Sequence, residues 1–221
     1  YFEEGFTGEC LLGSYFNGIY ERQKAPAPGY KGIVQDTEFM VNSLDWLYLS
    51  VVAGGERLDL ATADYSDFVR ILDLKTGLLT RQFLWKTKTG DIEIKLERLV
   101  SMVHKEEAAQ RVTFASRNYQ GQITVLAGLN FNTTHGGAQM TLWDCYDQKV
   151  EEDRCSIKGK TIATNMEVES YCQLKGSLVD KATKESVVED KLVVMKYTCT
   201  LGSGQNLVLE KDIINITELA R

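Results

Sequence analysis

Apolar and polar side chains alternate with a period of two through most of this sequence, and short glycine-containing turns interrupt the pattern. Residues 92–96 alternate cleanly after the turn Gly90-Asp91, and residues 78–86 form an equally strong segment before it. Successive side chains of a β-strand point to opposite faces, so this pattern predicts strands with one buried face. Further strands are expected at residues 46–52, 111–116, 122–129, 189–200 and 206–216.

Short strands joined by glycine turns are typical of an antiparallel sandwich or barrel. Strands do not alternate with helical segments, which disfavours a fold built from βαβ units. With 221 residues, of which 43% are hydrophobic, the chain can form one large all-β domain over residues 1–221. Residues 131–161 are polar and contain glycine, so we expect a long excursion or small hairpin on the surface there.

The charge distribution argues against two classes of partner. The net charge is −6, and no block of five or more lysines and arginines occurs. Neither a nucleic-acid-binding footprint nor a polybasic membrane patch is therefore expected. No apolar run approaches a membrane-spanning length and no signal peptide is visible, so we expect a cytoplasmic protein.

The cysteines give no sign of a metal site. No CxxC spacing is present, so we expect neither zinc binding nor any other metal or cofactor. Free thiols in a reducing compartment are the main expectation, although Cys145 and Cys155 could pair in a secreted protein. The five positions are Cys10, Cys145, Cys155, Cys172 and Cys199.

Three basic residues fall on strand faces that are otherwise apolar: Arg81, Arg98 and Lys211. A buried charge must be paired or reach solvent. One explanation is an ion pair with an acid such as Asp73 or Glu97, or a bulge that turns the side chain outward. The other is that this face docks against a second domain, where the planar guanidinium of arginine suits bridging contacts.

No catalytic constellation is evident. His104 and His135 both fall in segments expected to be solvated turns or loops, although a sugar isomerase would need a histidine with a carboxylate. The adjacent pairs Glu3-Glu4 and Glu106-Glu107 would point to opposite faces of a strand, so neither forms a ready acid–base dyad.

Aromatic side chains that could stack on a sugar ring are the remaining candidates for binding. Trp46 and Trp85 lie within expected strands, where core packing is the default. Trp143 lies in the polar segment after residue 131 and is therefore the candidate for a surface contact with sugar.

Several motifs resemble the N-terminal domain of glycoside hydrolase family 65. Phe2-Glu3-Glu4-Gly5 and the block from Gly13 to Glu21 resemble the opening motifs of that family. Residues 72–81 resemble its LD-x-x-x-G-x-L-x-R segment, and residues 97–102 its E-R-x-x-S-M segment. The clear matches cover residues 1 to about 130 and return after about 185, which makes residues 131–186 a divergent excursion.

The resemblance implies a large antiparallel super-sandwich similar to galactose mutarotase-like domains. It also implies that catalysis resides in an (α/α)6 barrel that is absent from this chain, so no residue here inherits a catalytic role. The family includes maltose, kojibiose and trehalose phosphorylases, which use inorganic phosphate as co-substrate and invert an α-linked glucoside to β-glucose 1-phosphate. We expect a non-catalytic domain that packs on the barrel and supports a homodimer. The candidates for the polar network at that boundary are Arg70, Asp73, Arg81, Glu97 and Arg98.

Two other functions fit the sequence. One is an independent carbohydrate-binding module, and the other is a mutarotase-like sugar isomerase. Within the family interpretation, the parent could also be a hydrolase, since the barrel determines the reaction.

Overall fold

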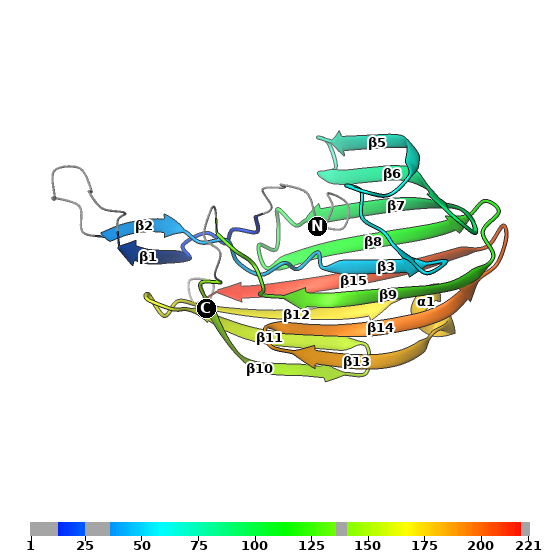
Figure 1. Cartoon of the computed structure of the whole chain (residues 1–221). Coiled ribbons are helices and arrows are strands. Elements are labelled where there is room, and N and C mark those ends of the chain that lie inside the picture. The colour runs from blue at the N-terminus through cyan, green and yellow to red at the C-terminus, as the bar shows by residue number, and fades with distance from the viewer. Residues whose placement is uncertain (1–12, 25–35, 136–140, 218–221) are drawn as a thin grey trace.

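The alternating segments form two stacked antiparallel sheets (Figure 1). The computed structural model describes residues 13–24, 36–135 and 141–217. Strands dominate these ranges, and the one helix within them is the short α1 (Ser177–Lys181). The predicted all-β antiparallel class is confirmed. No helix among the described residues is long and apolar enough to cross a membrane.

The larger sheet has eight strands in the order β10-β11-β12-β15-β8-β7-β6-β5. Every neighbouring pair in it is antiparallel. Its strands are β5 (Tyr65–Asp73), β6 (Leu78–Thr87), β7 (Gly90–Val100), β8 (Glu107–Ser116), β10 (Trp143–Glu151), β11 (Arg154–Thr161), β12 (Glu167–Lys175) and β15 (Asn206–Thr217).

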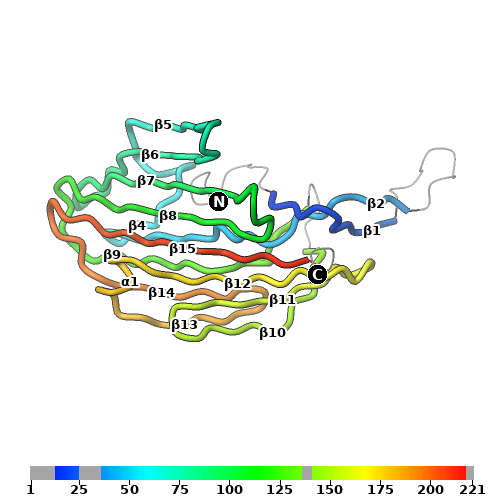
Figure 2. The backbone as a smooth tube through the Cα atoms, turned by 180° about the vertical axis from the view of Figure 1, so that it is seen from behind, coloured from blue at the N-terminus to red at the C-terminus, as the bar shows by residue number. Residues whose placement is uncertain are grey.

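The smaller sheet has five strands in the order β13-β14-β9-β3-β4. In Figure 1 it lies in front of β15, β12, β11 and β10, and β5 and β6 extend beyond it. We call the face of the large sheet that it covers the inner face and the opposite one the outer face. Figure 2 views the molecule from the outer face, which no described strand covers. The strands of the smaller sheet are β3 (Leu49–Ala53), β4 (Glu56–Arg57), β9 (Gly121–Asn130), β13 (Thr183–Glu189) and β14 (Leu192–Leu201).

The core lies between the two sheets and consists of the apolar side chains that the alternation predicts. Phe83, Ile94 and Phe114 are fully buried on the inner face, and Val125 and Tyr197 are buried on the opposing sheet. Close approach of the layers excludes a side chain at Gly159, where a Cβ would lie 2.8 Å from the Phe131 ring. The core is continuous, as expected for two layers that each bury one face.

A separate two-stranded hairpin extends from one end of the sandwich (Figure 1). It consists of β1 (Tyr20–Lys24) and β2 (Asp36–Met40), paired in register from Tyr20 opposite Met40 to Lys24 opposite Asp36. An isolated hairpin is only marginally stable in water, so contacts at its base are needed to orient it.

The structure corrects the expectation for residues 131–161. The hairpin alternative is right in form, since β10 and β11 pair antiparallel, but the hairpin is no surface excursion: both strands are integral to the eight-stranded sheet, and β12 continues it to β15. The inner side chains Trp143, Cys155 and Ile157 are buried. Lysine and acidic residues on the outer face lower the apolar fraction of β10 and β11, so that the composition of these strands is typical of a loop.

Two predicted strands have different bounds. Residues 46–48 precede β3 instead of belonging to it, because Leu47 N donates to Asp45 Oδ1 in a local turn. The run 189–200 contains a hairpin turn between β13 and β14, with Lys191 at φ 61°. Asp190-Lys191 is thus a turn that the charge pattern did not reveal.

Candidate functional site

Two regions of the large sheet carry most of its polar chemistry: a row of polar side chains on the inner face and a pocket on the outer face. The inner row crosses β7, β8 and β15, where Arg98 lies opposite Gln110 and Gln110 lies opposite Lys211. Lys211 Nζ donates to the backbone carbonyls of Tyr48 at 3.1 Å and Gly128 at 2.9 Å. Gln110 Nε2 donates to the Leu47 carbonyl at 3.4 Å. Lys211 and Gln110 therefore hydrogen-bond to backbone carbonyls on the side of the smaller sheet. This explains why polar side chains occur on a face that is otherwise apolar.

The five predicted boundary residues do not share one face. Arg70 lies opposite Arg81 on the inner face, and Arg98 follows the same alternation. The side chains of Asp73 and Glu97 lie on the outer face. The strand register therefore does not allow one network to join all five residues on a single face. The strands place these residues near one another, but on opposite sides of the sheet.

The two acids have local partners on their own side. Glu97 Oε1 accepts from Lys95 Nζ at 2.7 Å. Asp73 Oδ1 accepts from Lys75 N at 2.9 Å in the β5–β6 turn. That backbone hydrogen bond, followed by one from the Thr76 side chain, lowers the pKa of Asp73. Asp73 thus shapes a turn.

The arginines differ in burial. Arg81 is 4% exposed, whereas Arg70 on the edge strand is exposed, with its guanidinium 5.7 Å from the Phe68 ring centroid. Arg81, Arg98 and Gln110 line a small cavity of about 10 Å3. That volume is close to what one water molecule needs, so the cavity is too small for a sugar.

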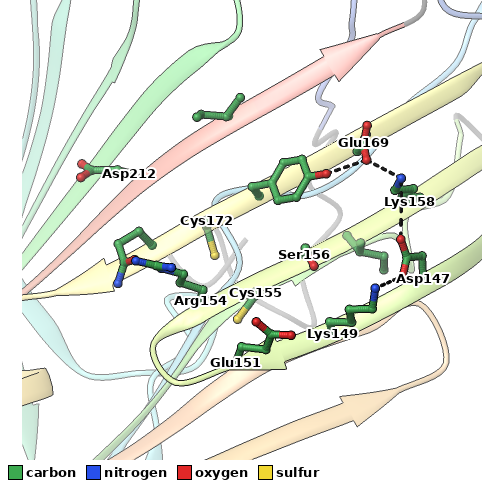
Figure 3. Close-up of a pocket in the computed structure, with 14 residues that line it drawn as sticks. Asp147, Lys149, Glu151, Arg154, Cys155, Ser156, Lys158, Glu169, Cys172 and Asp212 are labelled. Atoms are coloured by element: carbon green, nitrogen blue, oxygen red, sulfur yellow. Dashed lines mark hydrogen bonds and ion pairs between the residues drawn. The ribbon is translucent and has the colours of Figure 1, made fainter.

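The outer face holds a larger pocket of about 420 Å3 over β10, β11, β12 and β15 (Figure 3). A chain of polar contacts crosses it. Lys149 Nζ contacts Asp147 at 2.6 Å, and Lys158 Nζ contacts Asp147 at 3.6 Å and Glu169 at 2.5 Å. Tyr171 donates its hydroxyl proton to Glu169 at 2.6 Å. Alternation and register bring these side chains to one face.

The hydrogen bonds in this pocket favour the charged forms of Asp147 and Lys158 and the neutral form of Tyr171. The hydrogen bond from Lys149 lowers the pKa of Asp147, and the hydrogen bond to Glu169 raises the pKa of Lys158. The same carboxylate raises the pKa of Tyr171. The pocket offers hydroxyl, ammonium and carboxylate groups for hydrogen bonding beside the half-exposed Ile214. It suits recognition of a polar ligand more than proton transfer.

Glu21 is a structural residue that the motif alone did not reveal. Its side chain is 1% exposed, and its carboxylate accepts from the backbone N–H groups of Ala163 at 3.0 Å and Thr164 at 3.2 Å. Thr164 Oγ1 in turn donates to the Tyr20 carbonyl at 2.6 Å. These bonds fasten the base of the β1–β2 hairpin to the turn after β11. A glutamate that follows an apolar–aromatic pair was the only sequence signal.

The expectation that Trp143 lies on the surface is wrong. Its side chain is 1% exposed, its ring packs 4.9 Å from that of Phe131, and its Nε1 donates to the Asn42 carbonyl at 2.8 Å. In this fold the ring is not accessible for stacking on a sugar. The sequence suggests a surface position for this indole only because the polar composition of its segment is typical of a loop.

The two histidines differ. His104 is exposed in the turn between β7 and β8, as predicted. His135 lies in a loop, as predicted, but is half-buried instead of fully solvated. Its Nδ1 accepts from Asn42 N at 3.1 Å, and its ring stacks on Phe39 at 4.3 Å.

The cysteine pairing considered for a secreted protein does not match the register. Cys145 lies opposite Gly159, and Cys155 lies opposite Val150 on one side and Cys172 on the other. Cys145, Cys155, Cys172 and Cys199 are free thiols, and Cys10 lies outside the described residues. Among the residues that the structure describes, no group of three or more metal-ligating side chains gathers.

The fold defines a large antiparallel sandwich domain in which the inner polar row and Glu21 serve packing and anchoring, and in which a polar pocket lies on the outer face. The profile "Glycosyl hydrolase family 65, N-terminal domain" matches residues 1–220, and the chain belongs to this family. The resemblance seen in the opening motifs is therefore confirmed.

Known relatives agree with this assignment. The α,α-trehalose phosphorylase of Thermoanaerobacter brockii is 30% identical over 209 residues, covering 91% of this chain and 24% of the relative. The kojibiose phosphorylase of Caldanaerobacter subterraneus subsp. tengcongensis is 33% identical over 125 residues, covering 56% of this chain and 15% of that protein. A solved structure described as a kojibiose phosphorylase from human microbiome superposes with a TM-score of 0.87 at 30% identity, covering 97% of this chain and 28% of that chain. The matched region spans between 15% and 28% of the length of these relatives, in the N-terminal domain of the family.

Proposed function

We propose that this domain is the non-catalytic N-terminal part of an inverting α-glucoside phosphorylase. The parent enzyme would split an α-linked glucose disaccharide, such as maltose, kojibiose or trehalose, with inorganic phosphate as co-substrate and release β-glucose 1-phosphate. The relatives named above are phosphorylases, which supports a phosphorylase over a hydrolase as the parent. Inverting phosphorolysis needs one protein carboxylic acid, because phosphate replaces the water that a second carboxylate would activate.

In this proposal the domain docks on an (α/α)6 barrel that carries the catalytic acid, and it contributes to a homodimer. The enzyme would act in the cytoplasm. The observation that carries the docking role is an exposed apolar corner, defined as the end of β5, the β5–β6 turn and the end of β7 with the residues that follow. Its members are Val69, Ile71, Leu72, Leu74, Leu99, Val100, Met102 and Val103.

This apolar corner is unusual for a solvent-facing edge. Leu74 is 87% exposed and Met102 is 93% exposed. Soluble proteins seldom leave a contiguous patch of large apolar side chains in water unless a partner covers it. β5 is also an edge strand, whose free backbone groups are normally protected by charges or by a covering element. A second domain that covers this corner would shield both the apolar side chains and the free backbone groups of β5 from water.

Substitution in the protein encoded by the complete reading frame tests the docking role. Leu74→Asp places a charge at the centre of the apolar corner but costs the sandwich itself little, because the side chain is exposed. Its matched control is Val188→Asp, which alters an exposed apolar residue on the edge strand β13 of the other sheet. We expect Leu74→Asp to lower the thermal midpoint and phosphorolytic activity and Val188→Asp to leave both near wild type. Equal behaviour of the two variants would rule out docking at this corner.

The outer-face pocket supports a second candidate, an independent carbohydrate-binding module. Tyr171 and Ile214 supply a partly apolar surface, and Lys158 and Glu169 supply hydrogen-bonding groups beside it. Small-molecule sites commonly combine apolar and aromatic contact with a few well-placed polar groups. Titration calorimetry with maltose and trehalose tests it: heat that disappears in Tyr171→Ala supports binding, and no heat at millimolar sugar rejects it.

A further inference from the structure

Cys155 and Cys172 lie directly opposite each other on β11 and β12. Both are on the inner face, with exposed fractions of 1% and 3%. Figure 3 shows the two thiols side by side on the neighbouring strands. Of the described cysteines, this pair alone has matching strand positions, since Cys145 faces Gly159 and Cys199 faces Ile123.

The register gives the spacing of the pair. Leu174 N donates to the Asp153 carbonyl at 2.8 Å, two residues beyond Cys172 and Cys155 along the same ladder. Hydrogen-bonded pairs alternate in an antiparallel ladder, so Cys155 and Cys172 also occupy a hydrogen-bonded pair, with Cα atoms about 5.5 Å apart. Disulfides span Cα separations of about 4.4–6.8 Å. The backbone therefore places the two sulfur atoms within bonding reach without a strand shift.

The surroundings favour ionisation of one thiol. The Cys155 thiol donates a hydrogen bond to the Cys172 sulfur, and this bond lowers the pKa of Cys172. The charge of Lys211 lowers this pKa further, whereas burial has the opposite effect. The same hydrogen bond raises the pKa of Cys155. Lys211 is on the same face of β15, two residues from Ile213, which lies opposite Cys172. Two adjacent cysteines, of which one has a lowered pKa, are the arrangement that an attacking and a resolving cysteine require.

We propose that Cys155 and Cys172 are a peroxide-reactive dithiol that closes reversibly to a cross-strand disulfide. The oxidant is hydrogen peroxide, which is small and uncharged and reaches buried groups through local opening of the sheet. Disulfides of cytoplasmic proteins are commonly of this transient, redox-responsive kind. The bond would join β11 to β12 within the eight-stranded sheet.

The chemistry is balanced in two steps. The Cys172 thiolate attacks one oxygen of hydrogen peroxide, the O–O bond breaks, and hydroxide leaves, so Cys172 becomes a sulfenic acid. The Cys155 sulfur then attacks the Cys172 sulfur, its proton and the sulfenic hydroxyl leave as water, and the S–S bond forms. Both sulfur atoms are oxidised and the peroxide is reduced to two equivalents of water once the hydroxide is protonated.

Peptide mapping of the folded protein after peroxide treatment tests the proposal. Trypsin would release Cys155 in residues 155–158 and Cys172 in residues 161–175, so the disulfide appears as one linked species that has lost two hydrogens and separates on reduction. We expect this species as the main cysteine product. In Cys155→Ser, which keeps a hydrogen-bond donor beside Cys172, the link is lost, and Cys172 is instead trapped as a sulfenic acid by dimedone.

Cys199→Ala is the matched control, because Cys199 has no opposing cysteine; we expect the link to form at the wild-type rate in that variant. The proposal is overturned if peroxide modifies Cys145 or Cys199 in the folded protein while residues 155–158 and 161–175 stay unlinked. It is equally overturned if the link appears only after unfolding in denaturant. Circular dichroism before trypsin digestion establishes which state reacted.

Discussion

Lys211 on the eight-stranded sheet donates a hydrogen bond to the Gly128 carbonyl oxygen on the five-stranded sheet, at 2.9 Å. The ammonium also bonds the Tyr48 carbonyl, so one buried lysine joins both sheets through main-chain acceptors. We predict that Lys211→Met lowers the free energy of unfolding by about 1–3 kcal/mol, because two buried carbonyls lose their donor. Urea denaturation followed by tryptophan fluorescence measures the change.

Lys175→Met is the control for that substitution. Lys175 pairs with Asp212 at 2.5 Å, with about half of each side chain exposed. Exposed pairs contribute roughly 0–1 kcal/mol, so this variant should stay close to wild type. If both variants lose the same stability, the buried contacts of Lys211 are not what joins the sheets.

Glu21 holds the β1–β2 hairpin through the backbone N–H groups of Ala163 and Thr164. Glu21→Ala should cost about 2–4 kcal/mol, because it leaves donors at a buried site without their acceptor. Hydrogen exchange should show faster exchange at those two amides. Glu38→Ala removes an exposed partner of Arg22 on the same hairpin and should cost under about 1 kcal/mol. Unchanged protection at Ala163 in Glu21→Ala would disprove the anchoring role.

Trp143 is a core residue in this account. Trp143→Ala should destabilise the domain by about 3–5 kcal/mol, as for other large aromatic truncations. Trp143→Phe should cost less, since it keeps the contact with Phe131 but removes the donor to the Asn42 carbonyl. Thermal unfolding by calorimetry compares the two. A wild-type midpoint for Trp143→Ala would mean that the ring is not in the core.

Tyr146 should titrate at unusually high pH. Its hydroxyl donates to Glu167 Oε1 at 2.6 Å, and this hydrogen bond raises the pKa of Tyr146 to about 12. The folded pKa is above the unfolded value of about 10. The bond's stabilising contribution is therefore complete below pH 10 and is lost as the pH rises through about 12. The difference in tyrosinate absorbance between wild type and Tyr146→Phe measures this step, and a midpoint near 10 would contradict the bond.

The sequence predicted the fold class because alternation is a local property. Residues 92–96 became the centre of β7 with Ile92 and Ile94 fully buried, as their spacing required. The same rule failed for β10 and β11, where the outer face carries Lys149, Lys158 and their acidic partners. A strand with so polar an outer face has the composition of a loop, and only its pairing in the sheet distinguishes the two.

The candidate site was harder to predict because it depends on strand order. The sequence correctly indicates that Arg81 and Arg98 are charges on an apolar face. Which acids share that face depends on the register between strands, and a single strand does not reveal the register. The chain of contacts from Lys149 to Tyr171 joins three strands and was not visible in any segment alone. The positions of Cys155 and Cys172 likewise became informative only after β11 and β12 were paired.

We propose that this sandwich supports catalysis without performing it. The most direct measurement is phosphate-dependent release of β-glucose 1-phosphate from maltose, kojibiose and trehalose, for the 221-residue chain beside the protein encoded by the complete reading frame. We expect release by the complete protein and none above the uncatalysed background by the 221-residue chain. Phosphorolysis of any of the three sugars by the chain alone, abolished by a substitution within it, would contradict the claim.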